Sequence, residues 1–126
     1  MCGIVGCVGR PDETIDVLMH GLAKLEYRGY DSAGVALANG QVEIEKREGK
    51  LDNLETALEG IDLDGPVGIG HTRWSTHGPP SDHNSHPHAD CEGEVAVIHN
   101  GIIENFQTVK DELVAAGHEF ESDTDT

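Results

Sequence analysis

Apolar and polar positions in the first quarter of the chain follow first the period of a strand and then that of a helix. Residues 2–8 are apolar enough to form a buried strand, which would hold the amino terminus in place. A turn at residues 10–12 follows, with Asp12 as the expected helix cap. The next apolar residues recur at helical spacing, which predicts an amphipathic helix ending near residues 27–29. Its apolar face consists of Ile15, Leu18, Met19, Leu22 and Leu25.

An antiparallel hairpin is predicted next. Residues 34–38 and 42–48 flank the dipeptide Asn39-Gly40, which readily adopts the positive φ of a tight turn. Apolar residues at helical spacing then predict a short helix from Leu51 to Leu58, closed by Gly60.

The second half of the chain carries one long polar segment. A strand is predicted over residues 67–72, and residues 75–93 predict a loop, because they are rich in Pro, His, Ser and Asp. Residues 94–99 predict a strand and residues 106–116 a helix that ends at Gly117. The tail from residue 118 predicts the start of a further strand.

Hairpins mixed with helices predict an α+β fold of antiparallel sheets in layers, rather than a wound parallel sheet. The 126 residues are enough for one domain and too few for two. Because the chain stops in a polar strand without a closing element, we expect residues 1–126 to be a piece of a larger domain.

Charge and cysteine content narrow the class of protein. With 24 acidic against 8 basic residues and a net charge of -16, the chain repels nucleic acid and anionic membranes. Such acidity is typical of a protein adapted to a salt-rich cytoplasm, although a mesophilic acidic protein is the alternative. Three cysteines without framework spacing and no apolar run of membrane-spanning length predict a soluble, cytoplasmic protein.

The cysteine directly after the initiator methionine is a candidate nucleophile. Removal of Met1 would leave Cys2 with a thiol and a free α-amine on one carbon. An α-amine has a pKa of about 7.7 to 8.0, so it can accept the thiol proton near neutral pH. The alternative is that Cys2 is only a small, tolerated second residue.

Two further stretches could bind a small substrate. In GHTRWSTHG, residues 70–78, Arg73 at the end of a strand offers a rigid fork of donors to a carboxylate, and Trp74 an apolar cover. In HNGI, the amide of Asn100 and the backbone of Gly101 could hold an oxyanion. The alternatives are a structural ion pair with a packed tryptophan, and an ordinary tight turn.

The polar loop raises one more possibility, a metal site. Its imidazoles and a nearby thiol suit zinc or nickel, but their spacing matches no rigid template, and the prolines favour an ordered loop. The possible ligands are His77, His83, His86, His88 and Cys91. In the earlier stretch YRGYDSAG, Arg28 and Asp31 are expected to form a buried structural pair.

Taken together, the motifs CGIVG, LEYRGYDSAG, GHTRWSTHG, the HPH loop and HNGIIEN resemble one family along the whole chain. The family that they resemble is the class II glutamine amidotransferase domain of glutamine-fructose-6-phosphate aminotransferases. The resemblance implies an N-terminal nucleophile hydrolase fold, an αββα sandwich of which about the first half is present. It also implies a glutaminase that works through a cysteinyl thioester and needs no metal or cofactor.

The resemblance implies a role for each matched residue. Cys2 would be the nucleophile, and Asn100 and Gly101 would form the oxyanion hole. Substrate glutamine would be bound at its carboxylate by Arg73 and at its amino group by Asp125. The closing loop would contribute Trp74, Thr76 and His77.

The resemblance also implies partners for this chain. Carboxy-terminal sugar-phosphate isomerase domains would receive the ammonia and add it to fructose 6-phosphate, in an enzyme expected to be a homo-oligomer. Two alternatives stay open at this stage: a catalytically inactive fragment that folds only by association, and a metal-binding module built on the histidine loop.

Overall fold

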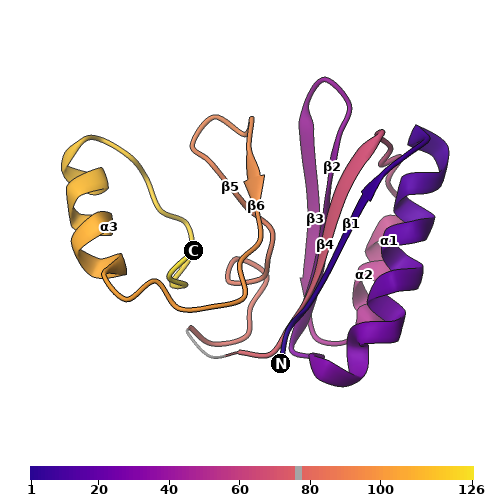
Figure 1. Cartoon of the computed structure of the whole chain (residues 1–126), viewed down its shortest axis with the longest axis horizontal. Coiled ribbons are helices and arrows are strands. Elements are labelled where there is room, and N and C mark those ends of the chain that lie inside the picture. The colour runs from indigo at the N-terminus through magenta and orange to yellow at the C-terminus, as the bar shows by residue number, and fades with distance from the viewer. Residues whose placement is uncertain (76–77) are drawn as a thin grey trace.

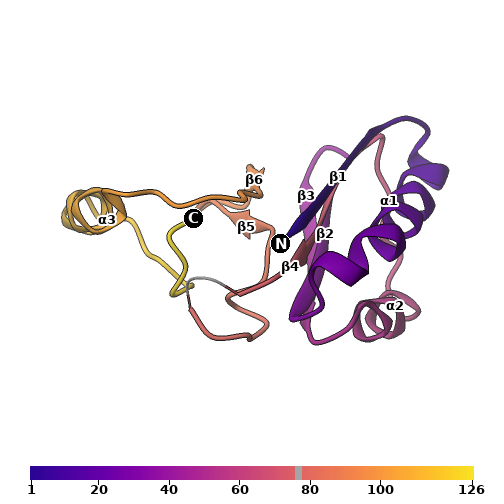
Figure 2. The same cartoon turned by 60° about the horizontal axis from the view of Figure 1, so that its bottom comes forward.

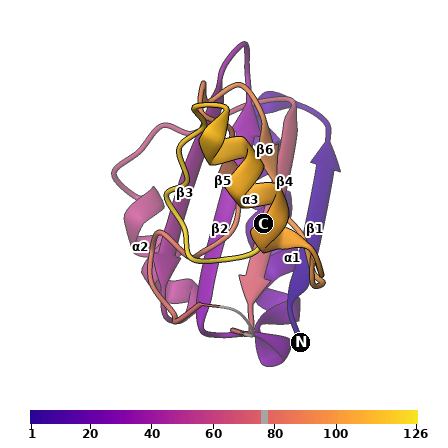
Figure 3. The same ribbon diagram turned by 90° about the vertical axis from the view of Figure 1, so that its left-hand side faces the viewer.

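Four layers make up the molecule in the computed structural model, which describes residues 1–75 and 78–126. Figure 1 shows helices α1 (Pro11–Leu25) and α2 (Leu51–Leu58) covering one face of a four-stranded sheet. A two-stranded sheet lies opposite the other face, and α3 (Phe106–Ala115) lies beyond it. The same succession of layers is visible in Figure 2 and, from the α3 side, in Figure 3.

The larger sheet is antiparallel throughout and has the order β1-β4-β2-β3. Its strands are β1 (Gly3–Val8), β2 (Ser32–Ala38), β3 (Val42–Glu48) and β4 (Val67–Arg73). Strands β1 and β4, which are far apart in the sequence, therefore pair directly, with Gly3 opposite Thr72. The smaller sheet consists of β5 (His88–Ala89) and β6 (Ala96–Val97).

The hydrophobic core lies between the larger sheet and the two helices that cover it. Leu18 and Leu22 of α1 and Leu54 of α2 are completely buried. Val35 and Leu37 of β2 meet them from the sheet. Burial of a leucine side chain is worth about 1.5 to 3 kcal/mol, so this cluster is the main source of stability in the described chain.

Small residues in β4 allow α1 to lie close to the sheet. A Cβ at Gly68 would lie 2.8 Å from side-chain atoms of both Leu18 and Thr14, and a Cβ at Gly70 would lie 3.1 Å from Leu22. Because these contacts are tighter than side chains tolerate, the two glycines set the distance between helix and strand.

Most of the predicted elements are confirmed. The strand at the amino terminus, the hairpin, the short helix, the strand before the polar segment and the last helix all occur within one or two residues of their predicted bounds. The long helix ends at Leu25, and the short 3-10 helix η1 (Glu26–Arg28) continues it to the predicted end near residues 27–29. The hairpin turns at Gly40, whose φ of 76° is in the left-handed region that glycine favours.

Four predictions about local structure are wrong. The long helix begins at Pro11 with Arg10 as its N-cap, so Asp12 lies inside the first turn, where it complements the helix dipole instead of capping. The loop predicted for residues 75–93 contains β5, and the strand predicted for residues 94–99 shortens to β6. No strand forms in the tail after residue 117, all of which the structure describes.

Helix α3 differs from the other helices in its environment. None of its ten residues, all of them described, is buried. Val109, Leu113 and Val114 are exposed apolar residues of this helix, and Phe120 follows it. Within the described part of the chain, moreover, no helix is both long enough and apolar enough to cross a membrane.

The buried face of α1 provides a test of the core. We expect Leu22→Ala to lower the free energy of unfolding by about 2 to 5 kcal/mol, because it leaves a cavity against Gly70 and β2. Val17, which is 48% exposed on the same helix, is the matched control, and Val17→Ala should change stability by about 0.5 kcal/mol or less. Denaturant unfolding of both variants measures this, and equal losses would contradict the proposed packing.

Candidate active site

Cys2 lies beside the end of β4, because it directly precedes β1, which pairs with that strand. The backbone N–H of Trp74 donates a hydrogen bond to Cys2 Sγ at 3.2 Å. The thiol in turn lies 3.5 Å from the Trp74 carbonyl oxygen, to which it donates. The two contacts fix the position of the Cys2 sulfur against the backbone that directly follows Arg73.

Arg73, the last residue of β4, is held by β2 and by the segment that precedes that strand. Its residue is only 4% exposed, and its backbone pairs with Ser32 of β2. Gly29 approaches so closely that a Cβ there would lie 2.8 Å from the Arg73 carbonyl carbon. The guanidinium donates to the carbonyl oxygens of Gly78 at 3.1 Å and Pro79 at 3.3 Å, so it also fixes the loop that follows.

The electrostatics of Arg73 indicate which groups surround it. Burial lowers the pKa of its guanidinium, while the negative charges of Cys2, Asp31 and Asp125 raise it again. Cys2 and Asp125 come from opposite ends of the chain. The fold therefore brings the predicted nucleophile and the predicted amino-group ligand each within electrostatic reach of Arg73.

The predicted pair of Arg28 and Asp31 is wrong. Asp31 Oδ2 accepts a hydrogen bond from the backbone N–H of Ser75 at 2.7 Å, and the N–H of Asp31 donates to the Arg73 carbonyl at 3.0 Å. Arg28 instead donates through Nη2 to the Met1 sulfur at 3.3 Å. Asp31 thus anchors the backbone on both sides of Trp74.

Trp74 is 44% exposed and its ring meets the edge of Tyr30, with the ring centroids 5.5 Å apart at an interplanar angle of 78°. An exposed ring at the mouth of the site suits the predicted role as a cover better than the alternative of a packed core residue. Thr76 and His77, the other two residues assigned to the closing loop, lie outside the described residues.

Asn100 is connected to β4 through a histidine that the sequence had not singled out. Asn100 Oδ1 lies 2.6 Å from Nε2 of His71, a buried residue of that strand. Gly101 follows, and a Cβ there would lie 2.6 Å from the His99 ring, which would have to shift to admit a side chain. Asn100 therefore has a tertiary connection to β4, which a turn alone would not give.

Asp125 connects the tail to the same segment. Its Oδ2 accepts a hydrogen bond from the backbone N–H of Ile103 at 2.7 Å. Thr126 adds a second contact, between its hydroxyl and His99 Nδ1 at 3.4 Å. The structure therefore joins the segments that carry Asn100, Gly101 and Asp125 to each other, and joins Cys2 and Trp74 to Arg73.

Comparison with known proteins agrees with this arrangement. A family model described as "Glutamine amidotransferase domain" matches residues 38–126. The chain belongs to this family.

Curated relatives of the amidotransferase domain are named glutamine–fructose-6-phosphate aminotransferase (isomerizing). The relative from Pyrococcus horikoshii is 57% identical and that from Symbiobacterium thermophilum 58%, in each case over 100% of this chain. The chain spans 21% of the length of either relative.

Solved structures confirm the predicted fold class. The amidotransferase domain matches the glutamine phosphoribosylpyrophosphate amidotransferase of B. subtilis, determined with ADP and GMP, with a TM-score of 0.78 and 27% identity over 98% of this chain and 27% of that one. It matches a structure described as the allosteric regulatory enzyme of purine biosynthesis with a TM-score of 0.80 and 25% identity over 97% and 27% of the two chains. The fold is α+β, of the N-terminal nucleophile hydrolase type.

Three buried histidines stack beside the site. The ring centroid of His86 lies 4.6 Å from that of His71 and 4.5 Å from that of His88. Burial lowers the pKa of His71 to about 4, of His86 to about 2 and of His88 to about 4. His88 Nε2 also lies 3.0 Å from the hydroxyl of Thr124, next to Asp125. The stack is uncharged at neutral pH.

The histidine loop is ordered by hydrogen bonds within the protein. His83 pairs with Asp123 at 3.3 Å, and Asn84 bonds both Pro79 and Asp123. Among the described residues, no group of three or more histidine, cysteine or acidic side chains has the arrangement to hold a metal ion. Lys46 of β3 donates to the carbonyl oxygens of Ser85 and Pro87, so the loop packs against the larger sheet.

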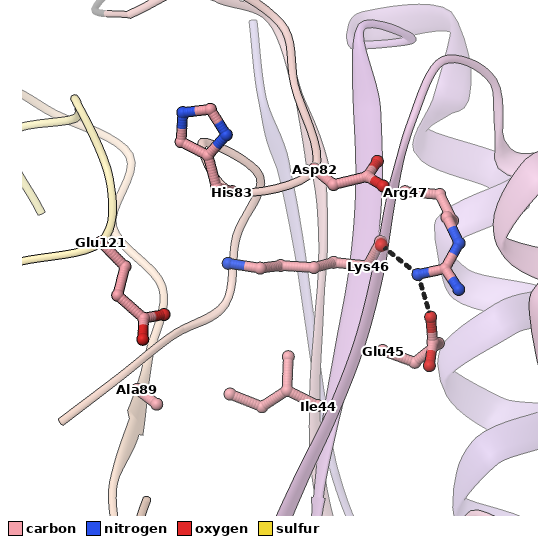
Figure 4. Close-up of a pocket in the computed structure, with 8 residues that line it drawn as sticks. All are labelled: Ile44, Glu45, Lys46, Arg47, Asp82, His83, Ala89 and Glu121. Carbon is pink, nitrogen blue, oxygen red and sulfur yellow. Dashed lines mark hydrogen bonds and ion pairs between the residues drawn. The ribbon is translucent and has the colours of Figure 1, made fainter. Parts of the chain in front are cut away.

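A pocket of about 500 Å³ lies between β3 and the histidine loop. Figure 4 shows side chains of β3 on one side and His83 and Glu121 on the other, with Asp82 directed towards β3. Lys46 extends across it and donates to the carbonyl oxygens of Ser85 at 2.9 Å and Pro87 at 3.1 Å. The pocket is lined by none of the residues predicted to bind or attack glutamine, but its lysine secures the loop that carries His86.

The three stacked histidines predict that the folded protein loses stability in acid. Since the folded pKa values of these histidines lie below the ordinary 6.5, the unfolded chain binds more protons, and the free energy of unfolding falls as pH drops from about 6.5 towards about 4. We expect His86→Phe to lose less stability than the wild type over this interval, in denaturant unfolding at several pH values. His20→Gln, at an exposed site on α1, should behave like the wild type. Parallel curves for all three proteins would contradict the prediction.

Proposed function

We propose that this chain is the glutaminase part of a glutamine-fructose-6-phosphate aminotransferase. It hydrolyses glutamine to glutamate and ammonia, and the full-length enzyme adds that ammonia to fructose 6-phosphate. The observation that carries the proposal is the position of the Cys2 thiol. Its sulfur accepts a hydrogen bond from the backbone N–H of Trp74, the residue that follows the buried Arg73. The identity of more than half to relatives of that name supports it.

The nucleophile is Cys2, with its own α-amine as general base once Met1 has been removed. Met1 is 75% exposed, which supports access for an aminopeptidase. The amine takes the thiol proton, and the thiolate attacks the side-chain amide carbon of glutamine. No auxiliary base or metal ion is needed for this step.

Substrate is held by charges at both ends of its zwitterion. Arg73 binds the α-carboxylate, and Asp125 binds the α-amino group. Their shared electrostatic environment supports this assignment. Trp74, Thr76 and His77 belong to the loop that closes over the ligand. With its two charged ends fixed, the side-chain amide of glutamine is presented to sulfur.

The reaction then forms an oxyanion twice, first when sulfur attacks the amide and again when water attacks the thioester. Donors from Asn100 and Gly101 stabilise the negative oxygen formed when sulfur attacks. As the C–N bond breaks, the protonated amine gives its proton to the leaving group, and ammonia departs from a thioester on Cys2. Water attacks the thioester carbonyl, the C–S bond breaks, and glutamate and the free thiol are released.

We propose that residues 1–126 form the first part of the amidotransferase domain, and that sugar-phosphate isomerase domains follow in a cytoplasmic homo-oligomer. The exposed apolar residues of α3 support additional chain against that helix. Three free cysteines support a reducing compartment.

The nucleophile is tested by Cys2→Ala in the natural full-length chain. We expect glutamine hydrolysis to fall to background, because no other group replaces the attacking sulfur, while the melting temperature stays close to that of the wild type. Cys91→Ala, which removes an exposed thiol, is the control and should retain full activity. Measurable ammonia release by Cys2→Ala would refute the assignment.

Carboxylate binding is tested by Arg73→Lys. A point charge replaces a planar fork, so the KM for glutamine should rise about 10- to 100-fold with a smaller change in kcat. Arg47→Lys is the matched control, since Arg47 pairs with Glu45 on β3 and contacts no predicted site residue among those described. An unchanged KM in Arg73→Lys, measured by steady-state ammonia release, would argue against this role.

A further inference from the structure

The contact between His71 and Asn100 defines the proton position on the imidazole. Asn100 Oδ1, 2.6 Å from His71 Nε2, is a carbonyl-type oxygen that can only accept. His71 Nε2 must therefore carry the hydrogen. Among the described residues, Nδ1 of His71 has no hydrogen-bond partner and is buried. A hydrogen there would be a buried, unsatisfied donor, so the tautomer protonated at Nε2 is favoured.

The same contact fixes the orientation of the Asn100 carboxamide. With Oδ1 bound to His71, the Nδ2 hydrogens point away from the strand. Asn100 is itself exposed, and in this sequence it is the residue that has to supply an N–H donor. If the carboxamide turned over, its oxygen would face the developing negative charge and repel it.

The His71 ring is held on several sides. The residue is 1% exposed and stacks on His86 at an interplanar angle of 34°. The segment that carries His86 is tied to β3 by Lys46, which donates to the carbonyls of Ser85 and Pro87. Gly34 of β2 lets the His86 carbonyl oxygen approach, because a Cβ at that position would collide with it.

The protonation state of His71 agrees with this tautomer. Burial is the main cause that lowers the pKa of His71, to about 4, and the nearby Arg73 acts in the same direction. The imidazole is therefore neutral at neutral pH and carries a single hydrogen, at the nitrogen that meets Asn100.

We propose that His71 is a positioning residue that holds the carboxamide of Asn100 with its N–H donor directed at the oxyanion. This inference rests on the proposed glutaminase function. His71 touches neither glutamine nor the thiol in this role, and it acts through Asn100.

The kinetic test compares three variants in the natural full-length chain. His71→Phe removes the donor and keeps a ring, whereas His71→Gln restores a donor. His86→Phe is the matched control, because it replaces a neighbouring ring of the stack that has no contact with Asn100 in the described structure. We expect His71→Phe to lower kcat about 10- to 100-fold with little change in KM, and His71→Gln to recover most of it. His86→Phe should retain wild-type kcat.

A second readout separates the oxyanion hole from the thiol. Alkylation by iodoacetamide displaces iodide from carbon and forms no oxyanion, so its rate at Cys2, followed by peptide mass spectrometry, should be the same in wild type and His71→Phe. If kcat is unchanged in both His71 variants, or if His86→Phe lowers it as much as His71→Phe, the inference is overturned. Equal losses of kcat and alkylation rate would also overturn it.

A third measurement is independent of activity and of the folding of any variant. Nitrogen-15 spectra of histidine-labelled wild-type protein at pH 7.5 should show His71 as the neutral tautomer protonated at Nε2. The Nδ1-protonated tautomer, or a charged ring, would overturn the inference. If the wild type hydrolyses no glutamine, the proposed function fails, while this spectrum still decides whether His71 donates to Asn100.

Discussion

The antiparallel pairing of β1 with β4 is the interaction on which the site depends. It sets Gly3 opposite Thr72, and so brings Cys2 to the end of the strand that carries Arg73 and Trp74. A shift of the register by one residue would turn every side chain of β1 to the other face of the sheet. The pairing is fixed in turn by α1, whose leucines pack over the glycines of β4.

Local chemistry made most of the elements predictable. The apolar face of α1 follows a clear helical period, and the Asn39-Gly40 turn has a known conformational preference. The two-residue strand β5 could not be predicted, because two residues are too few to show an alternating apolar pattern, and its pairing with the nearby β6 becomes visible only in the fold. The tail from residue 118 resembles a strand in composition, but it pairs with no strand among the described residues and contacts β5 through the side chains of Thr124 and His88.

The candidate site was predictable to a different extent at each residue. Cys2 could be singled out because its chemistry depends on its place beside the amino terminus, and Arg73 because it ends a strand. His71 was missed and Asp31 was assigned the wrong partner, because their contacts are made across the fold, with Asn100 and with the Ser75 backbone. A histidine at a buried strand position, flanked by small residues, was the signal that could have indicated the first of these.

Lys46 and Arg73 are unusual in a protein with a net charge of -16, because both of these scarce cations are turned inward onto backbone carbonyl oxygens. Dissolved ions weaken attraction and repulsion between exposed charges over distances of several ångströms, but they reach such enclosed contacts far less. Changes in ionic strength will therefore act mainly on the mutual repulsion of the acidic exterior. The hydrogen bonds from Lys46 and Arg73 that hold the loops against the sheet should therefore keep their strength at low and at high salt concentration.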